Sequence, residues 1–227
     1  MKSRLVRLAI LIAGSWLWAA EAASAPEATL PHMTAAKRIV MIEPDVQLME
    51  LDAGGILEPR ADWTKAAQTF IGEDLRAHFA NRGVELVNAE RPTQRDIQLV
   101  KLHAVVAQEI LAHIYDRDAS LRTKTSPRDW TLGPGTNEMR DRYGADYALF
   151  IFVRDSYATA NRKTVEILGN LTGAKLDIAT QQGFASLVDL RSGNIVWFNR
   201  VLSQFGDLRT KEPAQRTVDA LIKDMPL

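Results

Sequence analysis

Residues Tyr147 to Val153 are apolar at every position, and this run constrains the fold more than any other part of the chain. A strand that faces water on one side alternates apolar and polar residues, whereas an unbroken apolar run is typical of a strand covered on both faces. Helical patterns alternate with shorter strand-like runs along the rest of the chain. We therefore predict an α/β fold, a mixed β-sheet with packed helices that forms a two-layer or three-layer α/β sandwich.

The remaining elements follow from periodicity and from turn residues. Strands are expected at 39–42, 46–51, 84–87, 184–190 and 195–201, and helices at 62–81, 93–115, 137–143 and from Pro213 onward. The last two strands flank the short turn Arg191 to Asn194, which predicts a C-terminal β-hairpin followed by a helix. Residues 118–136 are rich in Pro and Gly and are expected to form a long loop.

The first residues have the layout of a secretory signal peptide. Lys2, Arg4 and Arg7 precede the apolar stretch 8–20, and small residues follow. The stretch is short for a membrane span, which needs about 20 residues, although an uncleaved anchor is the alternative. Ala20 and Ala22 frame the expected cleavage site after Ala22. We therefore expect a signal peptide at 1–22, a disordered lead-in at 23–37 and a single α/β domain at 38–227.

Composition and motifs argue against several classes of function. The chain has 28 basic and 28 acidic residues, so it lacks the positive charge that nucleic-acid binding requires. It has no cysteine, which predicts neither a lipid anchor nor a disulfide. No zinc-binding histidine motif, phosphate-binding glycine loop or serine nucleophile motif is present. We expect no metal, no cofactor and no catalytic residue, and a periplasmic or secreted protein without a transmembrane span.

Asp74 and His78 lie four residues apart on the first predicted helix, which is the spacing of an acid and base on one helix face. They fall within the arc that includes Ile71 and Leu75, the expected buried face. A partly buried structural pair is commoner than a catalytic one, so we interpret this pair as structural.

The long helix at 93–115 carries two apolar stripes. One can cover the sheet, and the other, about a third of a turn away, is our candidate interaction surface. This second stripe consists of Leu99, Leu102, Val106 and Ile110. The alternative is that the loop 118–136 folds over the second stripe.

Four polar residues at strand ends form a candidate polar site. Arg154 and Asp155 follow the buried strand, and Asn199 and Arg200 lie on the hairpin. Structural salt bridges are the commoner role of such residues, and binding of a small ligand or hydrolysis is the alternative. The segment 154–182, polar at first and then weakly amphipathic, is expected to be a mobile flap or a contact segment.

Two segments carry a resemblance to other exported bacterial proteins. They are Gly144-Ala145-Asp146-Tyr147-Ala148-Leu149 and Gly183–Leu190 with Ser192-Gly193-Asn194-Ile195-Val196-Trp197. These segments resemble an uncharacterised family of exported bacterial proteins. More remotely, they are similar to the periplasmic α/β domains of the curli secretion channel and to the amino-terminal domain of the Tol-Pal translocation protein.

The resemblance implies an envelope accessory or protein-interaction domain without catalytic activity. Its expected partner is another envelope protein or a second copy of the chain. A small-ligand-binding protein or a hydrolase that uses polar groups at strand ends is the alternative.

Overall fold

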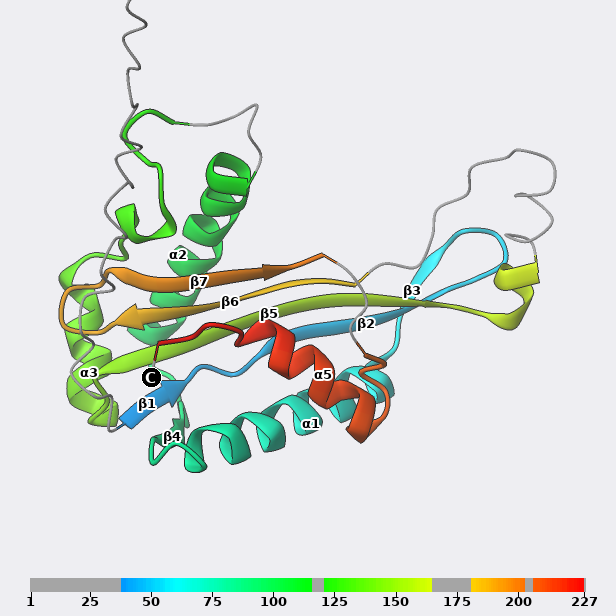
Figure 1. The fold of residues 1–227 in the computed structure, drawn as a ribbon, viewed down its shortest axis with the longest axis horizontal. Coiled ribbons are helices and arrows are strands. Elements are labelled where there is room, and N and C mark those ends of the chain that lie inside the picture. The colour runs from blue at the N-terminus through cyan, green and yellow to red at the C-terminus, as the bar shows by residue number, and fades with distance from the viewer. Residues whose placement is uncertain (1–37, 116–120, 165–180, 203–205, 227) are drawn as a thin grey trace, which may run out of the picture. The chain divides into compact units, whose positions relative to one another are not determined.

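A computed structural model of the protein describes residues 38–115, 121–164, 181–202 and 206–226. They form a mixed seven-stranded sheet packed with helices, which confirms the predicted α/β fold (Figure 1). The strands are β1 (Arg38–Met41), β2 (Asp45–Leu51), β3 (Leu57–Pro59), β4 (Glu85–Asn88), β5 (Tyr147–Ala158), β6 (Gln181–Asp189) and β7 (Ile195–Val201). The helices are α1 (Ala61–Ala80), α2 (Gln94–Ile110), α3 (Asn137–Tyr143) and α5 (Lys211–Leu221). The predicted signal peptide and lead-in lie outside the described residues.

Strands β1 and β2 lie end to end along one edge of β5, and both run parallel to it. Residues 39–41 pair with 147–149, and residues 45–51 pair with 152–158. Residues 42–44 of this line therefore face only residues 150 and 151 of β5. An extra residue of this kind is a β-bulge, which bends the strand and redirects its side chains. We call residues 42–44 the β1–β2 bulge.

The other edge of the β1–β2 line is paired only at its two ends. Strand β4 pairs in parallel with β1, and β3 pairs antiparallel with β2. Between them, side chains of α1 cover the open edge. The Thr64 hydroxyl accepts a hydrogen bond from the Leu48 amide at 3.0 Å, and Gln68 Nε2 donates to the Pro44 carbonyl at 3.3 Å. The β1–β2 bulge thus lies in a gap between two edge strands, beside α1.

Helices cover both faces of β5, as its apolar sequence predicts. Leu149 and Ile151 belong to the core that α1 and α5 complete on one face. Ala148 and Phe150 belong to the core that α2 and α3 complete on the other face (Figure 1). The sheet is therefore the middle layer between two layers of helices.

Several details differ from the prediction. Strand β5 continues to Ala158, so the first residues of the expected flap 154–182 belong to the sheet, and residues 165–180 lie outside the described part of the chain. Strand β3 was not predicted, because its three residues are exposed and show no alternation. In the expected loop 118–136, the described residues contain two short 3-10 turns, Pro127–Asp129 and Pro134–Thr136.

Helix α2 begins as expected, with a capping box between Thr93 and Asp96, and continues into a π-helical turn at Leu111–Tyr115. By length and composition alone, Gln94–Tyr115 is apolar enough to cross a membrane. In this fold the helix packs on the sheet through the buried residues Leu99 and Ile110.

The predicted hairpin of β6 and β7 is confirmed. Its turn requires a glycine, because Gly193 has a φ of 77° and a Cβ atom there would lie 2.0 Å from the Gly133 carbonyl oxygen. The segment around Gly133 therefore lies directly against the turn of the hairpin, and the Leu132 amide donates a hydrogen bond to the Gly193 carbonyl at 2.8 Å.

Candidate functional site

Three adjoining cavities meet at the β1–β2 bulge, and we call them together the bulge cleft. The first has a volume of about 480 Å³ and the second about 410 Å³, and both are lined by Glu43, Pro44, Gln68 and Ala89. The third is a small chamber of about 40 Å³ that also reaches Glu43. In open α/β sheets, ligands bind at the carboxyl ends of parallel strands. The bulge cleft lies at these ends of β1 and β4.

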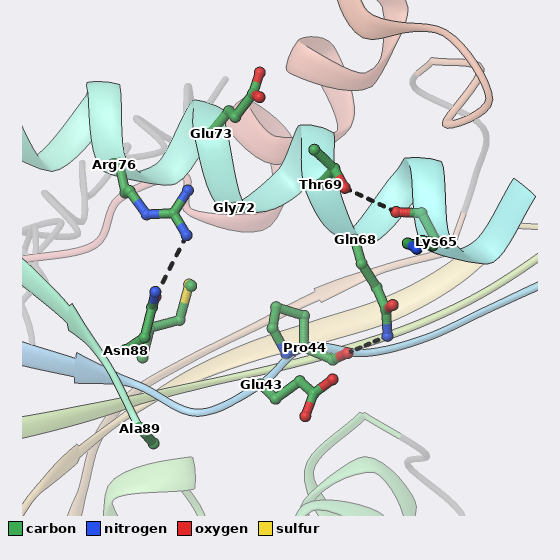
Figure 2. A pocket seen from close by; sticks show the side chains of 11 residues that line it. Glu43, Pro44, Lys65, Gln68, Thr69, Gly72, Glu73, Arg76, Asn88 and Ala89 are labelled. Atoms are coloured by element: carbon green, nitrogen blue, oxygen red, sulfur yellow. Dashed lines mark hydrogen bonds between the residues drawn. The ribbon is translucent and has the colours of Figure 1, made fainter. Parts of the chain in front are cut away.

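The first cavity lies against α1, and most of the residues that line it are polar or charged (Figure 2). Lys65 and Arg76 extend from this helix, and the Arg76 guanidinium points toward Asn88 at the end of β4, with a distance of 3.5 Å between Nη2 and Oδ1. Glu73 also lines this cavity, but its carboxylate pairs with Lys211 of α5 at 2.7 Å. We call this part the basic half of the bulge cleft.

The second cavity extends from the bulge toward α2 and has a mostly apolar lining. The apolar residues that line it are Ile42, Pro44, Ala89, Pro92, Ile97 and Val100. Its charged residues are Glu43, Asp45, Asp96 and Lys101. A concave apolar surface with a few polar groups is the usual form of a small-molecule site. We call this part the apolar half.

The small chamber continues from the apolar half to a buried histidine. Phe150, Phe152 and Phe184 line it together with His103 of α2. The His103 ring stacks on Phe150 with 3.8 Å between the ring centroids, and its Nε2 lies 2.6 Å from the Ser186 hydroxyl. Burial lowers the pKa of His103 to about 3, so the imidazole is neutral at neutral pH. Both His103 and Ser186 are buried, which argues for a structural hydrogen bond rather than a nucleophile and its base.

Gly72 leaves part of the basic half open. It lies in the middle of α1, where glycine costs roughly 0.5–1 kcal/mol relative to alanine. The nearest atoms to an added Cβ would be the Arg76 guanidinium nitrogens at 3.6 Å, an ordinary contact with a flexible side chain. The fold therefore has room for a larger residue here, and the glycine enlarges the cleft at the expense of helix stability.

We expect Gly72→Ala to raise the free energy of unfolding by about 0.5–1 kcal/mol, because alanine favours the helix and meets no clash. Urea denaturation measures this change. Gly183→Ala is the matched control and should be destabilising, because its Cβ would lie 2.7 Å from the Phe152 carbonyl oxygen. A loss of stability in Gly72→Ala would show that the wall of the cleft is tightly packed.

The second stripe of the long helix is not a single exposed surface, and this prediction is wrong. Ile110 is 0% exposed and Leu99 is 5% exposed, since both pack against the sheet, while Val106 is partly buried. Only Leu102, at 43%, is well exposed. The buried face of α2 combines Leu99 and Ile110 of this stripe with Ala107 and with the polar residues Asp96 and His103.

The four residues of the candidate polar site do not come together in one site. Arg154 pairs with Asp45 at 2.9 Å, and the Arg200 guanidinium lies over the Tyr115 ring. Asn199 Nδ2 donates to two carbonyl groups at the end of α5, those of Ala220 and Leu221. Three of the four residues thus have separate structural contacts.

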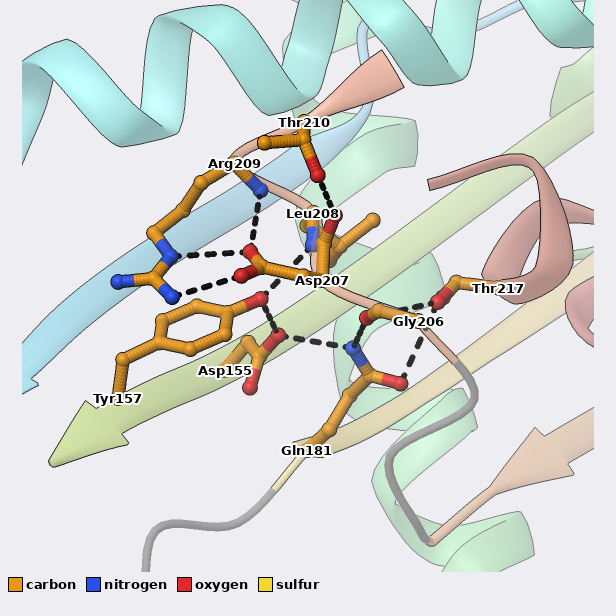
Figure 3. Close-up of polar contacts among 9 residues, drawn as sticks. All are labelled: Asp155, Tyr157, Gln181, Gly206, Asp207, Leu208, Arg209, Thr210 and Thr217. Atoms are coloured by element: carbon orange, nitrogen blue, oxygen red, sulfur yellow. Dashed lines mark hydrogen bonds and ion pairs between the residues drawn. The ribbon is translucent and has the colours of Figure 1, made fainter. Parts of the chain in front are cut away.

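Asp155 belongs instead to a buried polar cluster, shown in Figure 3, which joins β5 and β6 to the chain before α5. Its Oδ2 accepts hydrogen bonds from the Tyr157 hydroxyl and from Gln181 Nε2. The Tyr157 hydroxyl also accepts from the Leu208 amide at 2.8 Å, and Gln181 Nε2 also donates to the Gly206 carbonyl at 3.1 Å. Burial raises the pKa of Asp155. The cluster positions residues 206–208, so its role is structural.

Asp74 and His78 have no hydrogen bond between them in the structure. Burial raises the pKa of Asp74, and burial together with the nearby Arg82 lowers the pKa of His78. These directions are opposite to those of a carboxylate and imidazolium that stabilise each other. Among the residues that the structure describes, no group of three or more His, Cys, Asp or Glu side chains could hold a metal ion.

The bulge cleft was not predicted from the sequence. Glu43 and Pro44 marked only the end of a strand there, although a Pro between two strand-like runs is compatible with a bulge as well as with a turn. Lys65, Gly72 and Arg76 lie on the helix that follows, and no sequence motif links them to Ile97 and Val100 of α2.

Comparisons with known proteins do not assign the chain to a family. No protein-family model and no curated protein matches it. Lipoprotein GNA1162 from Neisseria meningitidis is 14% identical with a TM-score of 0.32, and the match covers 73% of this chain and 78% of that protein. The LpoB C-terminal domain from Salmonella enterica is 14% identical with a TM-score of 0.27, and the match covers 74% of this chain and 84% of that domain.

A third solved structure is protein XCC0632 from Xanthomonas campestris, of family DUF330. It is 13% identical with a TM-score of 0.34, and the match covers 88% of this chain and 85% of that protein. At such TM-scores the three structures assign neither a family nor a function. The similarity to the curli secretion channel and to the Tol-Pal translocation protein is not shown by these findings.

Proposed function

We propose that this chain is an exported, non-catalytic binding protein of the bacterial cell envelope, with the bulge cleft as its binding site. The export part rests on the secretory layout of residues 1–22. The binding part rests on one observation, the convergence of three cavities on the β1–β2 bulge at the carboxyl ends of β1 and β4.

Two features of the bulge cleft support binding rather than catalysis. Its apolar half is a concave surface within the size range of small-molecule sites, roughly 300–1,000 Å³. His103, which lines the small chamber of the cleft, has a pKa of about 3 and is unsuited to proton transfer near neutral pH. The bulge cleft therefore provides shape and charge for a ligand, and its walls come from α1, α2 and the end of β4.

Binding is tested with N-phenyl-1-naphthylamine, an uncharged apolar probe whose fluorescence rises in apolar surroundings. We expect the purified protein to bind the probe and Ile97→Asp to weaken binding by at least roughly tenfold, because it removes apolar lining worth about 1.5 kcal/mol or more. Ile97 lines the apolar half and is 37% exposed, so the substitution should leave the fold intact.

The matched control is Val105→Asp on the same helix. Val105 is 60% exposed and is not among the residues that line the bulge cleft, so this variant should bind the probe as the unmodified protein does. Equal binding by Ile97→Asp and the unmodified protein, with unchanged circular dichroism, would place the probe elsewhere and contradict the proposed site.

A further inference from the structure

We infer that the bulge cleft binds an amphipathic anion: a carboxylate or phosphate group in the basic half and an aliphatic chain in the apolar half. This inference rests on the proposed function and adds the chemistry of the ligand. It depends on which charged side chains around the cleft already have partners.

Most carboxylates of the bulge cleft are already paired with cations. Glu73 pairs with Lys211 at 2.7 Å, and Asp45 pairs with Arg154 at 2.9 Å. Asp96 is the third paired carboxylate, since its Oδ2 lies 3.4 Å from Arg142 Nε. The same oxygen accepts a hydrogen bond from the Thr93 amide in the capping box. These acidic groups contribute little uncompensated negative charge to a ligand in the cleft.

The basic residues of the bulge cleft are not compensated in this way. Lys65, Arg76 and Lys101 line the cleft, and none of them forms a salt bridge among the residues that the structure describes. Glu43 is the one lining carboxylate without a salt bridge in the same part of the chain. Three cations against one carboxylate leave an excess of positive charge, which favours an anionic ligand.

The geometry of the basic half suits a carboxylate or phosphate group. Arg76 approaches Asn88 with only one terminal nitrogen, at 3.5 Å, so its other N–H groups are available to a ligand. A guanidinium presents paired donors that match the oxygens of carboxylates and phosphates. Lys65 lies on the same wall, about three helical turns before Arg76, and adds a second positive charge to this wall (Figure 2).

An aliphatic chain suits the remaining length of the bulge cleft. From the basic half, the lining continues past Pro44 to Ile97 and Val100 and ends in the small chamber between Phe150 and Phe184. Removal of an aliphatic chain from water at this lining provides affinity in rough proportion to its buried area. The anionic group provides orientation, since a reversed ligand would bring its charge to the phenyl rings.

The test compares sodium decanoate with 1-decanol and decylammonium chloride, each below the concentration at which it aggregates, by displacement of N-phenyl-1-naphthylamine. We expect decanoate to bind roughly tenfold more tightly than either of the others and added salt to weaken decanoate binding selectively. Acetate and inorganic phosphate, which have no chain, separate the two parts of the ligand. Displacement by phosphate alone would identify the site as a simple anion site and overturn the amphipathic ligand.

Variants then locate the charge preference. Lys65→Gln combined with Arg76→Gln should weaken decanoate binding roughly tenfold and change decanol binding less than about twofold. The matched control is Arg82→Gln, an exposed cation just beyond the end of α1 and outside the cleft lining, which should leave decanoate affinity unchanged. An equal loss of decanoate affinity in Arg82→Gln would show that the preference for an anion depends on the overall charge of the protein, which would contradict the inference.

The outcomes separate this inference from the proposed function. If decanoate and decanol bind equally well and both lose affinity in Ile97→Asp, the bulge cleft is a binding site but the anionic ligand is wrong. If the protein binds N-phenyl-1-naphthylamine no differently from Ile97→Asp, the proposed function itself fails.

Discussion

Acidification from pH 7 to pH 4 is expected to lower the free energy of unfolding by about 3 kcal/mol through His103 alone. Burial lowers the pKa of this histidine in the folded protein to about 3, whereas the unfolded chain has the usual value near 6.5. Between these two pH values the unfolded state binds a proton that the folded state does not. The stabilisation is therefore complete above pH 6.5 and is lost as pH falls, by about 1.4 kcal/mol per pH unit.

Urea denaturation of the protein and of His103→Gln at pH 7, 6, 5 and 4 isolates this effect. Carboxylates whose pKa is lowered by hydrogen bonds in the folded state, such as Asp62 and Asp207, also reduce stability in acid, but they are present in both proteins. The difference between the two proteins should change by about 1.4 kcal/mol per pH unit. Parallel stability curves for the protein and His103→Gln would contradict the burial of a neutral His103.

The second large effect is expected at Asp155. Replacement by alanine should lower the free energy of unfolding by about 3 kcal/mol, because the buried Tyr157 hydroxyl and Gln181 amide each lose a hydrogen-bond acceptor. Residues 206–208, which this cluster positions, would be held less firmly against β5, because Tyr157 and Gln181 lose the carboxylate that orients them (Figure 3). Thermal and urea denaturation measure the loss, and hydrogen exchange at the Leu208 amide should accelerate as its Tyr157 acceptor becomes mobile.

Asp141→Ala is the matched control for Asp155→Ala. The Asp141 side chain is 77% exposed and its nearest ion pair is 3.8 Å long, so its removal should cost less than about 0.5 kcal/mol. Asp155→Asn adds a pH test. Because burial raises the pKa of Asp155 in the folded state, the carboxyl favours folding most when protonated. Relative to the protein, Asp155→Asn should therefore gain stability as pH rises from about 4. A constant difference between these two proteins would contradict the raised pKa.

Much of the fold was predictable because hydrophobic periodicity reports burial directly. The apolar run of β5 predicted a strand covered on both faces, and the hairpin and the capped start of α2 followed from local sequence. Strand β3 was missed because its pairing with β2 depends on a long-range register and not on its own three residues.

The orientation of α2 was not predictable from apolar residues alone. Its buried face includes Asp96 and His103, two polar residues that hydrophobic patterns place in water. Each has a polar partner far along the chain, Arg142 for Asp96 Oδ2 and Ser186 for His103 Nε2, and these contacts offset part of the cost of burial. The rotation that buries His103 also buries Leu99 and Ile110, and it leaves Leu102 exposed.

The bulge cleft was hidden for a related reason. A bulge is defined by the pairing of two strands with a third, and the sequence around Pro44 shows only that regular pairing stops there. The residues that line the cleft come from separate helices and strands and share no periodic pattern. Their net charge can be judged only from the structure, which pairs Glu73 with Lys211 and Asp45 with Arg154.

The most direct test of the bulge cleft is a map of amide shifts in ¹⁵N–¹H NMR spectra of the protein titrated with decanoate. We predict that the shifted amides cluster at Ile42, Glu43, Asp45, Gly72, Ile97 and Val100, which surround the two halves of the cleft. Shifts confined to exposed apolar residues elsewhere, such as Ile56 and Leu57 in the β2–β3 hairpin, would contradict the assignment of the cleft as the binding site.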